Sequence, residues 1–435
     1  MDSLALGELQ ARTFQGLLGA TDPVSGLIAD RWPSPSACSI GAQGFAFTVW
    51  AIAAARGWMS RGEAAGLTLK GLRTLSQAPQ GASAAGISGH RGWFYHFLNR
   101  QTGLRAGTCE LSTIDTALML AGALAAARAL DGDGPDEVEL RRLTGALYDA
   151  VDWAWATTPS GRIALGWTPE AGFIPYEWRG YNEAMILYVL ALGADYGPMS
   201  PSAWTSWTED YRRAWTTWPV PHLAFGPMFG HQYSHLWIDF RGIQDAFMRE
   251  LKLDYFENSR RAVVTQQAYA AANPGGWGGY SADFWGLTAC DGPGDFRQLQ
   301  GLRLRRFRSY AARGAHDFDD GTLAPTAMAA SLPFSPEIVL PSLERLIDAH
   351  GQAIYGPQGL QDAFNPTLTR PTPPAFGAVQ PGTGWVSHDM LGIDQGPILA
   401  MIENHRTGLV WRWMRDEPVI RRGLLKAGFT GGWLA

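Results

Sequence analysis

The sequence is poor in cysteine and in charged residues. Its 435 residues include only Cys38, Cys109 and Cys290, and no CxxC pair is present. This excludes a zinc ribbon or a thioredoxin-like motif, and at most one disulfide could form, with buried thiols the favoured state. Charged residues make up 17% of the chain, the net charge is -5, and no basic block is present. Nucleic acid is therefore excluded as an expected partner.

Long hydrophobic runs and targeting segments are also lacking. No run of about 18 apolar residues occurs, so no membrane span is predicted. The richest run, ALMLAGALAAARAL, is interrupted by Arg128 and predicts a buried helix. The first residues, MDSLALGELQARTFQGLL, lack the basic start, apolar core and cleavage site of a signal peptide. The compartment stays open: cytoplasmic for the chain as given, or periplasmic if a leader has been removed.

Helical periodicity dominates the rest of the chain. Apolar residues recur at three- and four-residue spacing in ten or more segments of roughly 12–20 residues each. Helix-start residues precede several of them: Ser39, Ser60, Ser112 or Thr113, and Ser335 followed by Pro336. Alternating strand patterns are scarce and short. Since no long linker interrupts the chain, we expect one all-α domain over residues 1–435.

Tryptophan is abundant, with 19 residues. Loops between the predicted helices combine Trp or Tyr with Gly and carboxylates, and flat rings with polar edges suit sugar ligands. The indoles expected in these loops are Trp93, Trp167, Trp178, Trp237, Trp277 and Trp285, whereas Trp50, Trp153, Trp155 and Trp215 are expected in the core. Helices arranged in a ring, with their loops gathered at one end, would form a toroid with one aromatic cleft.

Two carboxyl groups are needed to cleave an acetal bond, one as acid and one as base or nucleophile. Glu110 and Asp115 bracket a predicted helix start in CELSTIDTALML. Capping of that helix explains Glu110 as well as a catalytic role does. Asp115 precedes an apolar stripe, so it is harder to explain as a solvated surface residue. Glu183 lies on the first turn of another apolar helix, and Glu177 lies between two aromatic residues that would raise its pKa. We favour Glu183, because a helix end is the firmer mount.

The segment FGHQYSHLWIDFRG combines two histidines with an acid, as a metal site would. His231 and His235 are four residues apart, with Asp239 beyond them, but no Glu adjoins the first histidine as in a zinc protease motif. Aromatic neighbours favour contact with sugar hydroxyls over metal binding. An internal hydrogen-bond network is the alternative.

Other acidic and glycine-rich motifs also suit sugar binding better than a cofactor. DFDDG contains Asp319 and Asp320, but the twelfth position from Asp320 is Ser331, so the closing Glu of a calcium loop is missing. Asp394 in GIDQGP either caps a helix or faces the cleft. No GxSxG, GxGxxG or GxxxxGK[ST] motif occurs. No cofactor and no metal are therefore predicted.

These motifs together resemble the bacterial glycoamylase-like family that includes the endo-β-1,2-glucanases of glycoside hydrolase family 144. The matching segments include ELSTIDTAL, GWTPEAGFIPYEWRGYNEAMILYVLALG, FGPMFGHQYSHLWIDFRGIQDAFMRE, YAARGAHDFDDGTLAPTA and GIDQGPILAMIENHRTGLVW. They run in order from about residue 8 to 428. The resemblance implies an (α/α)6 barrel, a β-1,2-glucan substrate and no required metal.

The resemblance also implies which residues act. Glu110 and Glu183 are the leading catalytic carboxylates, Asp115 is the alternative base, and Asp115 and Asp239 are expected in the same region. The residues expected to bind substrate are Glu177, Trp178, Tyr181, His231, Tyr233, Trp237, Asp239, Arg241, Trp277, Trp285, Asp319, Asp320 and Asp394. Hydrolysis is expected to invert the anomeric configuration.

Several alternatives stay open. Residues 292–308 and 366–386 are predicted to be variable loops that could change chain-length specificity. An exo-acting enzyme or a transglycosylase would use the same fold. A glucan-binding protein without catalysis is the third possibility, and the oligomeric state is open.

Overall fold

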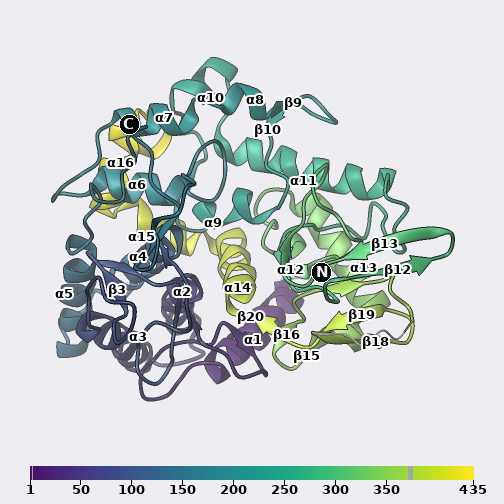
Figure 1. Ribbon diagram of the computed structural model, residues 1–435, viewed down its shortest axis with the longest axis horizontal. Helices are drawn as coiled ribbons and strands as arrows, with labels where there is room; N and C mark the ends of the chain where they lie inside the picture. Colours follow the sequence, from purple (N-terminus) through teal and green to yellow (C-terminus); the bar gives the residue numbers. More distant parts are fainter. Residues whose placement is uncertain (2, 371–375) are drawn as a thin grey trace.

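The computed structural model describes residue 1, residues 3–370 and residues 376–435. Residues 371–375 of the predicted variable loop 366–386 lie outside this part. The helices are α1 Ser3–Gly19, α2 Ile40–Arg56, α3 Arg61–Gln77, α4 Thr113–Ala129, α5 Pro135–Asp149, α6 Met185–Gly193, α7 Ser202–Thr208, α8 Tyr211–Ala214, α9 Phe229–Trp237, α10 Ala246–Leu251, α11 Tyr255–Ala272, α12 Pro325–Ala329, α13 Pro336–Ile354, α14 Gly392–Thr407, α15 Leu409–Arg415 and α16 Pro418–Lys426 (Figure 1). The helix-rich fold is confirmed.

The strands are short, as predicted. They are β1 Arg31–Trp32, β2 Cys38–Ser39, β3 Gly89–His90, β4 Trp93–Phe94, β5 Phe97–Leu98, β6 Leu111–Ser112, β7 Gly166–Thr168, β8 Gly172–Phe173, β9 Trp215–Thr216, β10 His222–Leu223, β11 Ala289–Cys290, β12 Phe296–Gln300, β13 Arg303–Phe307, β14 Ala311–Ala312, β15 Tyr355–Gly356, β16 Gly359–Leu360, β17 Phe364–Asn365, β18 Gly377–Gln380, β19 Gly384–Ser387 and β20 Met390–Leu391. They form small sheets of two or three strands between the helices.

The predicted helix starts coincide with the observed N-caps. The Ser39 side chain accepts a hydrogen bond from the backbone of α2, and Ser112 does so from the N–H of Asp115 in α4. Ser60 forms a full capping box with Glu63 in α3. Each cap satisfies a backbone donor that the first helical turn leaves free. Local sequence therefore fixes where these helices begin.

Six helices in the described part of the chain are buried on nearly every side: α2, α4, α6, α9, α12 and α14. Helix α2 packs on α4 and α14, α4 on α6, α6 on α9, and α12 on α14. Gln232 of α9 donates a hydrogen bond to the Ala327 carbonyl of α12, 2.9 Å away, which closes the circle of contacts. A Cβ atom on Gly122 of α4 would lie only 1.8 Å from the Gly44 carbonyl oxygen of α2, so this close crossing requires glycine.

Amphipathic helices cover this buried set. Helix α3 packs on α2 and α5, α1 on α14, and α16 on α6. Helix α13 buries Val339, Leu343 and Leu346 along one side while much of its other side faces solvent. This is the pattern that burial of one apolar stripe produces. No helix in the described ranges is long and apolar enough to cross a membrane.

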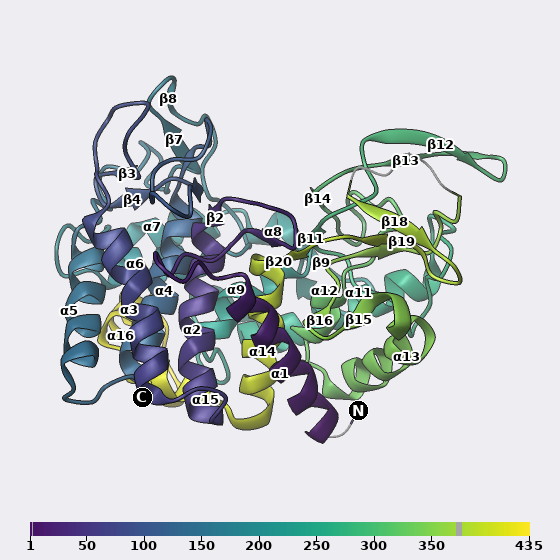
Figure 2. The ribbon, with the colours of Figure 1, turned by 90° about the horizontal axis from the view of Figure 1, so that it is seen from below.

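Most of the short strands gather at one end of the helices. Figure 2 shows β3, β4, β7, β8, β12 and β13 above the helices, with β12 and β13 forming a hairpin that extends away from the body. That hairpin lies within the predicted variable loop 292–308. The segment around residues 229–237 was expected in a loop, and this expectation is wrong, because it forms the buried helix α9. We call the strand-bearing end the loop face.

Candidate active site

A pocket of about 170 Å³ opens where helices α4, α6, α9 and α14 begin. Its lining residues are His96, Ile114, Asp115, Leu118, Glu183, Phe229, Tyr233, Ala289, Tyr310 and Ile393. Asp115 lies in the first turn of α4. Glu183 was expected on the first turn of its helix, but it lies two residues before Met185, the first residue of α6. Helix ends therefore hold two of the three predicted catalytic carboxylates in one pocket.

Among the residues that the structure describes, none forms an ion pair with Glu183. Its side chain is 9% exposed, and its Oε2 atom is buried without a hydrogen bond. Burial, followed by the negative charge of Asp115, raises the pKa of Glu183 to about 7. The Glu183 carbonyl accepts a hydrogen bond of 2.9 Å from the Ser234 hydroxyl, which ties this position to α9. Glu183 can therefore hold a proton near neutral pH.

His96 joins the other two predicted carboxylates. Its Nδ1 atom lies 2.8 Å from Oε1 of Glu110, and its Nε2 atom lies 3.5 Å from Oδ2 of Asp115. Burial alone would lower the pKa of His96, but Asp115 and Glu110 outweigh it and raise this pKa to about 9. Burial would likewise raise the pKa of Glu110, yet its contact with His96 lowers it below the ordinary value. Near neutral pH, a positively charged imidazole thus lies between two carboxylates.

Local strand pairing creates this contact. Tyr95 forms an antiparallel bridge with Leu111, and the His96 N–H donates to the Glu110 carbonyl at 2.8 Å. Asp115 is held from the other side, because the Ser112 hydroxyl donates to its Oδ2 atom at 2.5 Å. Sequence reasoning missed both His96 and Tyr310. No spacing motif marks them, and only the pairing of distant loop segments could have located His96.

The pocket therefore contains Glu183 with a raised pKa, while the pKa of Glu110 beside the pocket residue His96 is lowered. Two carboxyl groups whose environments separate their pKa values are the arrangement that acid/base hydrolysis of an acetal requires. In the part of the chain that the structure describes, no group of three or more His, Cys, Asp or Glu side chains could hold a metal ion. The geometry is suited to proton transfer.

Asp394 lies in the first turn of α14, next to the pocket residue Ile393. It is almost fully buried, and burial together with Asp362 raises its pKa. Asp362 also accepts a 2.8 Å hydrogen bond from the backbone of Asp291, whose carboxylate pairs with Arg31 at 2.8 Å. Asp394 thus ends a buried row of acids beside the pocket.

Besides Asp394, two predicted substrate-binding residues lie at or near the pocket. Tyr233 lines it, and its hydroxyl donates to the Ile393 carbonyl at 3.3 Å. Trp178 donates from its indole to the Thr113 hydroxyl at 2.9 Å, which places it at the start of α4. Glu177 instead forms a 2.7 Å ion pair with Arg162, and although burial would raise its pKa, hydrogen bonds from its neighbours lower it. The expectation of a raised pKa at Glu177 is wrong.

Four predicted binding residues are buried against protein partners. Tyr181 stacks on Tyr255, the ring of His231 lies 3.2 Å from the Phe225 carbonyl, Trp237 donates to Thr48, and Trp285 donates to Ser342. All are less than 5% exposed, as is Trp93. These contacts agree with the internal hydrogen-bond network that was the alternative to sugar contact for the histidine segment.

A second group surrounds the DFDDG motif. Asp320 forms a fully buried ion pair with Arg313 at 2.7 Å. Asp319 accepts hydrogen bonds from the hydroxyls of Tyr269 and Tyr280. The guanidinium of Arg305 stacks on the Trp277 ring, 3.9 Å from its centre. These acids bind neighbouring side chains and have no partner in the catalytic pocket.

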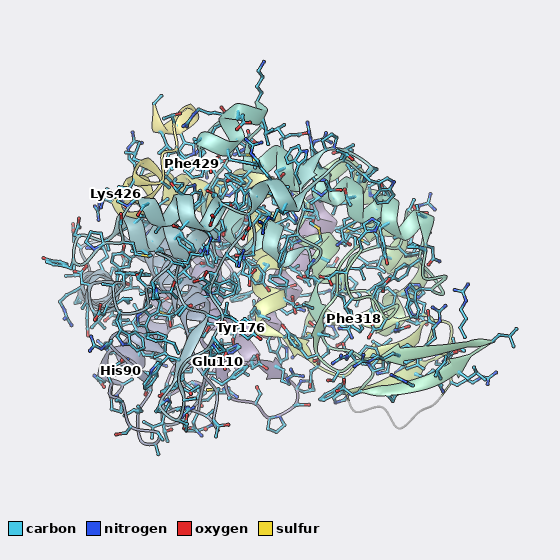
Figure 3. All side chains as sticks on the ribbon, turned by 45° about the horizontal axis from the view of Figure 1, so that its top comes forward. His90, Glu110, Tyr176, Phe318, Lys426 and Phe429 are labelled. Atoms are coloured by element: carbon cyan, nitrogen blue, oxygen red, sulfur yellow. The ribbon has the colours of Figure 1, made fainter. Side chains whose placement is uncertain are left out.

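Asp239 and Arg241 lie at the other end of the molecule. Asp239 follows the C-terminus of α9, whereas the pocket is at the N-terminus of that helix. The adjacent Phe240 packs on Phe429 at 5.9 Å, and Figure 3 shows Phe429 at the upper left, well away from Glu110 near the middle of the view. The expectation that Asp115 and Asp239 line the same region is therefore wrong.

Comparison with known proteins identifies the family of this chain. Residues 175–418, more than half of the chain, match the Glycoamylase family model, described as "Putative glucoamylase". The chain belongs to the Glycoamylase family. The resemblance inferred from its motifs is confirmed.

Named relatives extend the comparison over nearly the whole chain. An exo beta-1,2-glucooligosaccharide sophorohydrolase of Parabacteroides distasonis is 28% identical over 98% of this chain. The crystal structure of a beta-1,2-glucanase from the same organism is 26% identical, with a TM-score of 0.80 over 98% of this chain. This chain spans only 58% of the first protein and 60% of the second. An endo-beta-1,2-glucanase of Chitinophaga pinensis, 23% identical, shares the fold over the full length of both chains, with a TM-score of 0.83.

Proposed function

We propose that this protein is a glycoside hydrolase that cleaves β-1,2-glucan by general acid/base catalysis. The observation that carries the proposal is a buried Glu183 with a raised pKa in the same pocket as Asp115, next to a Glu110 whose pKa the pocket residue His96 lowers. The printed names of the relatives, which describe β-1,2-glucan hydrolases, supply the substrate class. A neutral glucan also agrees with the low charge of the chain.

In the proposed mechanism, Glu183 donates its proton to the glycosidic oxygen as the bond from that oxygen to the anomeric carbon breaks. A water molecule attacks the anomeric carbon from the opposite side and gives its proton to the base. Glu110 is our first candidate for this base and Asp115 the alternative. The charge of His96 keeps Glu110 ionised and orients it. Attack from the opposite side inverts the anomeric configuration.

We also propose that the circle of six buried helices and their outer partners form an (α/α)6 barrel as one domain. The closed series of helix contacts from α2 to α14 supports this arrangement. The likeness in fold to the Chitinophaga pinensis glucanase supports it too. In such a barrel the pocket occupies the end where the inner helices begin.

For substrate binding, we propose that Tyr233, Trp178 and Asp394 contact sugar units nearest to the catalytic carboxylates. Tyr233 lines the pocket, and Trp178 contacts Thr113 next to it. Asp394 lies one residue beyond Ile393. Carboxylate and phenol groups suit hydrogen bonding to sugar hydroxyls, while an indole offers a flat apolar face.

An exo-acting hydrolase is the second candidate. It is favoured by the name of the Parabacteroides distasonis relative, which describes release of sophorose from the non-reducing end. Both candidates use the same acid and base. They differ in whether the glucan chain continues past the pocket on both sides.

The test is incubation of the chain with linear and cyclic β-1,2-glucan, β-1,3-glucan and an α-glucan. We expect new reducing ends only with the β-1,2-glucans. Early products of mixed length would indicate endo action, and sophorose alone would indicate exo action. Proton NMR of the first products should show the inverted anomer. Activity restricted to an α-glucan would overturn the proposed substrate.

A further inference from the structure

A second cavity lies beyond the aromatic wall of the catalytic pocket. Its volume is about 340 Å³, and its lining includes Trp215, Trp218, His222, Phe225 and His316. Phe225 of this cavity packs on Phe229 of the catalytic pocket, with ring centres 5.5 Å apart. The linings of the two cavities therefore meet at this pair of phenylalanines. None of the predicted substrate-binding residues lines this cavity.

The cavity has the chemistry of a sugar-binding surface. Trp218 is 42% exposed and meets the edge of His316 at 4.9 Å. The nearly buried His222 uses Nδ1 to contact the Val220 carbonyl at 2.9 Å, which leaves its Nε2 atom for a ligand. Arg213, with an 84% exposed side chain, also lines the cavity and adds donors. Flat aromatic faces edged by hydrogen-bonding groups, with no carboxylate in the lining, fit a neutral polyhydroxyl ring.

The aromatic surface is held in place before any ligand binds. Strands β9 and β10 form a hairpin whose connection contains Trp218, followed by Pro219 and Pro221. Proline fixes a backbone angle, so little conformational freedom remains to be lost on binding. Across the cavity, His316 has a φ of 63°, in the left-handed region that side chains other than glycine rarely adopt. Such backbone strain is often found at ligand sites.

We propose that this cavity is a remote glucan subsite that binds a glucosyl unit several residues along the chain from the bond that is cleaved. The inference rests on the proposed function, because it takes the ligand to be a β-1,2-glucan. The chain would cross Phe225 and Phe229 and lay one ring on Trp218. Long glucans would then gain binding energy that short oligosaccharides cannot reach.

The test compares long β-1,2-glucan with a short oligosaccharide on the Trp218→Ala variant. We expect the ratio of kcat/KM for the long substrate to kcat/KM for the short one to fall about fivefold to tenfold, since one stacked ring is lost. Trp218→Phe should recover part of the ratio. Tyr196→Ala, an exposed aromatic residue outside both cavities, serves as the matched control and should leave the ratio unchanged.

Calorimetric titration of long β-1,2-glucan into Glu183→Gln, with and without Trp218→Ala, gives a readout independent of turnover. We expect Kd to rise about fivefold to tenfold with the second substitution. An active enzyme with an unchanged ratio and an unchanged Kd would overturn the subsite alone. If the protein binds glucan through Trp218 but does not hydrolyse it, the subsite proposal stands and the proposed catalytic function is wrong. Absence of both binding and hydrolysis would overturn both.

Discussion

Glu183 and Asp239 are both buried carboxylates at the ends of buried helices, yet they are in opposite electrostatic states. Glu183 lies at the loop face, has an oxygen without a partner, and has a pKa raised to about 7. Asp239 lies at the far end, where burial would raise its pKa but Arg241 and Arg415 lower it. Both carboxylates are buried, so the presence or absence of cationic partners determines which of them is charged near neutral pH. Glu183, which lines the pocket and is buried without such a partner, is therefore a candidate for proton transfer.

The largest expected effect separates these two carboxylates by activity. Glu183→Gln should lower kcat on β-1,2-glucan by at least about 100-fold, because the general acid is removed. Asp239→Asn should leave kcat of the folded protein within about twofold but lower the free energy of unfolding by about 1–3 kcal/mol, because it weakens the ion pairs with two arginines. Steady-state kinetics and denaturant unfolding measure the two effects. Wild-type turnover in Glu183→Gln would refute its role as the acid.

The next effect concerns stability against pH. The pKa of Glu183 rises from an ordinary 4.5 to about 7 on folding, so the folded state binds the proton more tightly. Wild-type stability should therefore fall as the pH rises from about 4.5 to about 7, by about 3 kcal/mol in total from this group. Glutamine does not ionise, so Glu183→Gln does not lose stability in this way. At about pH 8 it should unfold at a higher denaturant concentration than wild type. At about pH 4, wild type and Glu183→Gln should have similar free energies of unfolding. If the free energies of unfolding of the two proteins differed by the same amount at both pH values, Glu183 would not be a buried acid without a partner.

His96 offers a smaller and more specific test. Its charge lowers the pKa of Glu110, so His96→Phe should let that pKa rise towards its ordinary value. If Glu110 is the base, kcat should fall about tenfold and the acidic limb of the pH–activity profile should move to higher pH. A purely structural role would lower activity without moving the limb. An unmoved limb would contradict the role of Glu110 as the base.

The smallest effect is expected at Glu177. This side chain forms an ion pair with Arg162 and accepts hydrogen bonds from Thr158 and Ser160, and it does not line the catalytic pocket. Glu177→Gln should keep kcat/KM within about threefold and lower the free energy of unfolding by about 1 kcal/mol or less. Measuring it beside Glu183→Gln compares two acids only six residues apart. If Glu177→Gln lowered activity as much as Glu183→Gln does, Glu177 in the loop would become the candidate for the general acid.

Much of the fold was predictable because its signals are local. Ser39, Ser60 and Ser112 cap the helices that they were expected to start, since each cap depends only on the next few residues. The placement of Asp115 and Glu183 near helix starts was predictable for the same reason. For each serine cap, a short stretch of sequence contains both partners of the hydrogen bond.

Contacts between distant segments were not predictable in this way. His96 meets Glu110 through pairing of two loop segments, and Trp218 meets His316 across almost 100 residues of sequence. Asp239 resembles a site residue in sequence, because aromatic and histidine residues surround it. Its distance from the pocket follows from the nine-residue helix α9, which carries Phe229 to one end and Asp239 to the other.

The helix starts at the pocket have one more consequence. Helices α4, α6, α9 and α14 all begin there, so the partial positive charge of each N-terminus is directed towards the pocket. In the proposed mechanism the anomeric carbon also becomes positively charged as the glycosidic bond breaks. The field of these helix ends would therefore oppose the proposed reaction. The negative charge of Glu110, which contacts the pocket residue His96, would counteract that field in addition to any proton that Glu110 accepts.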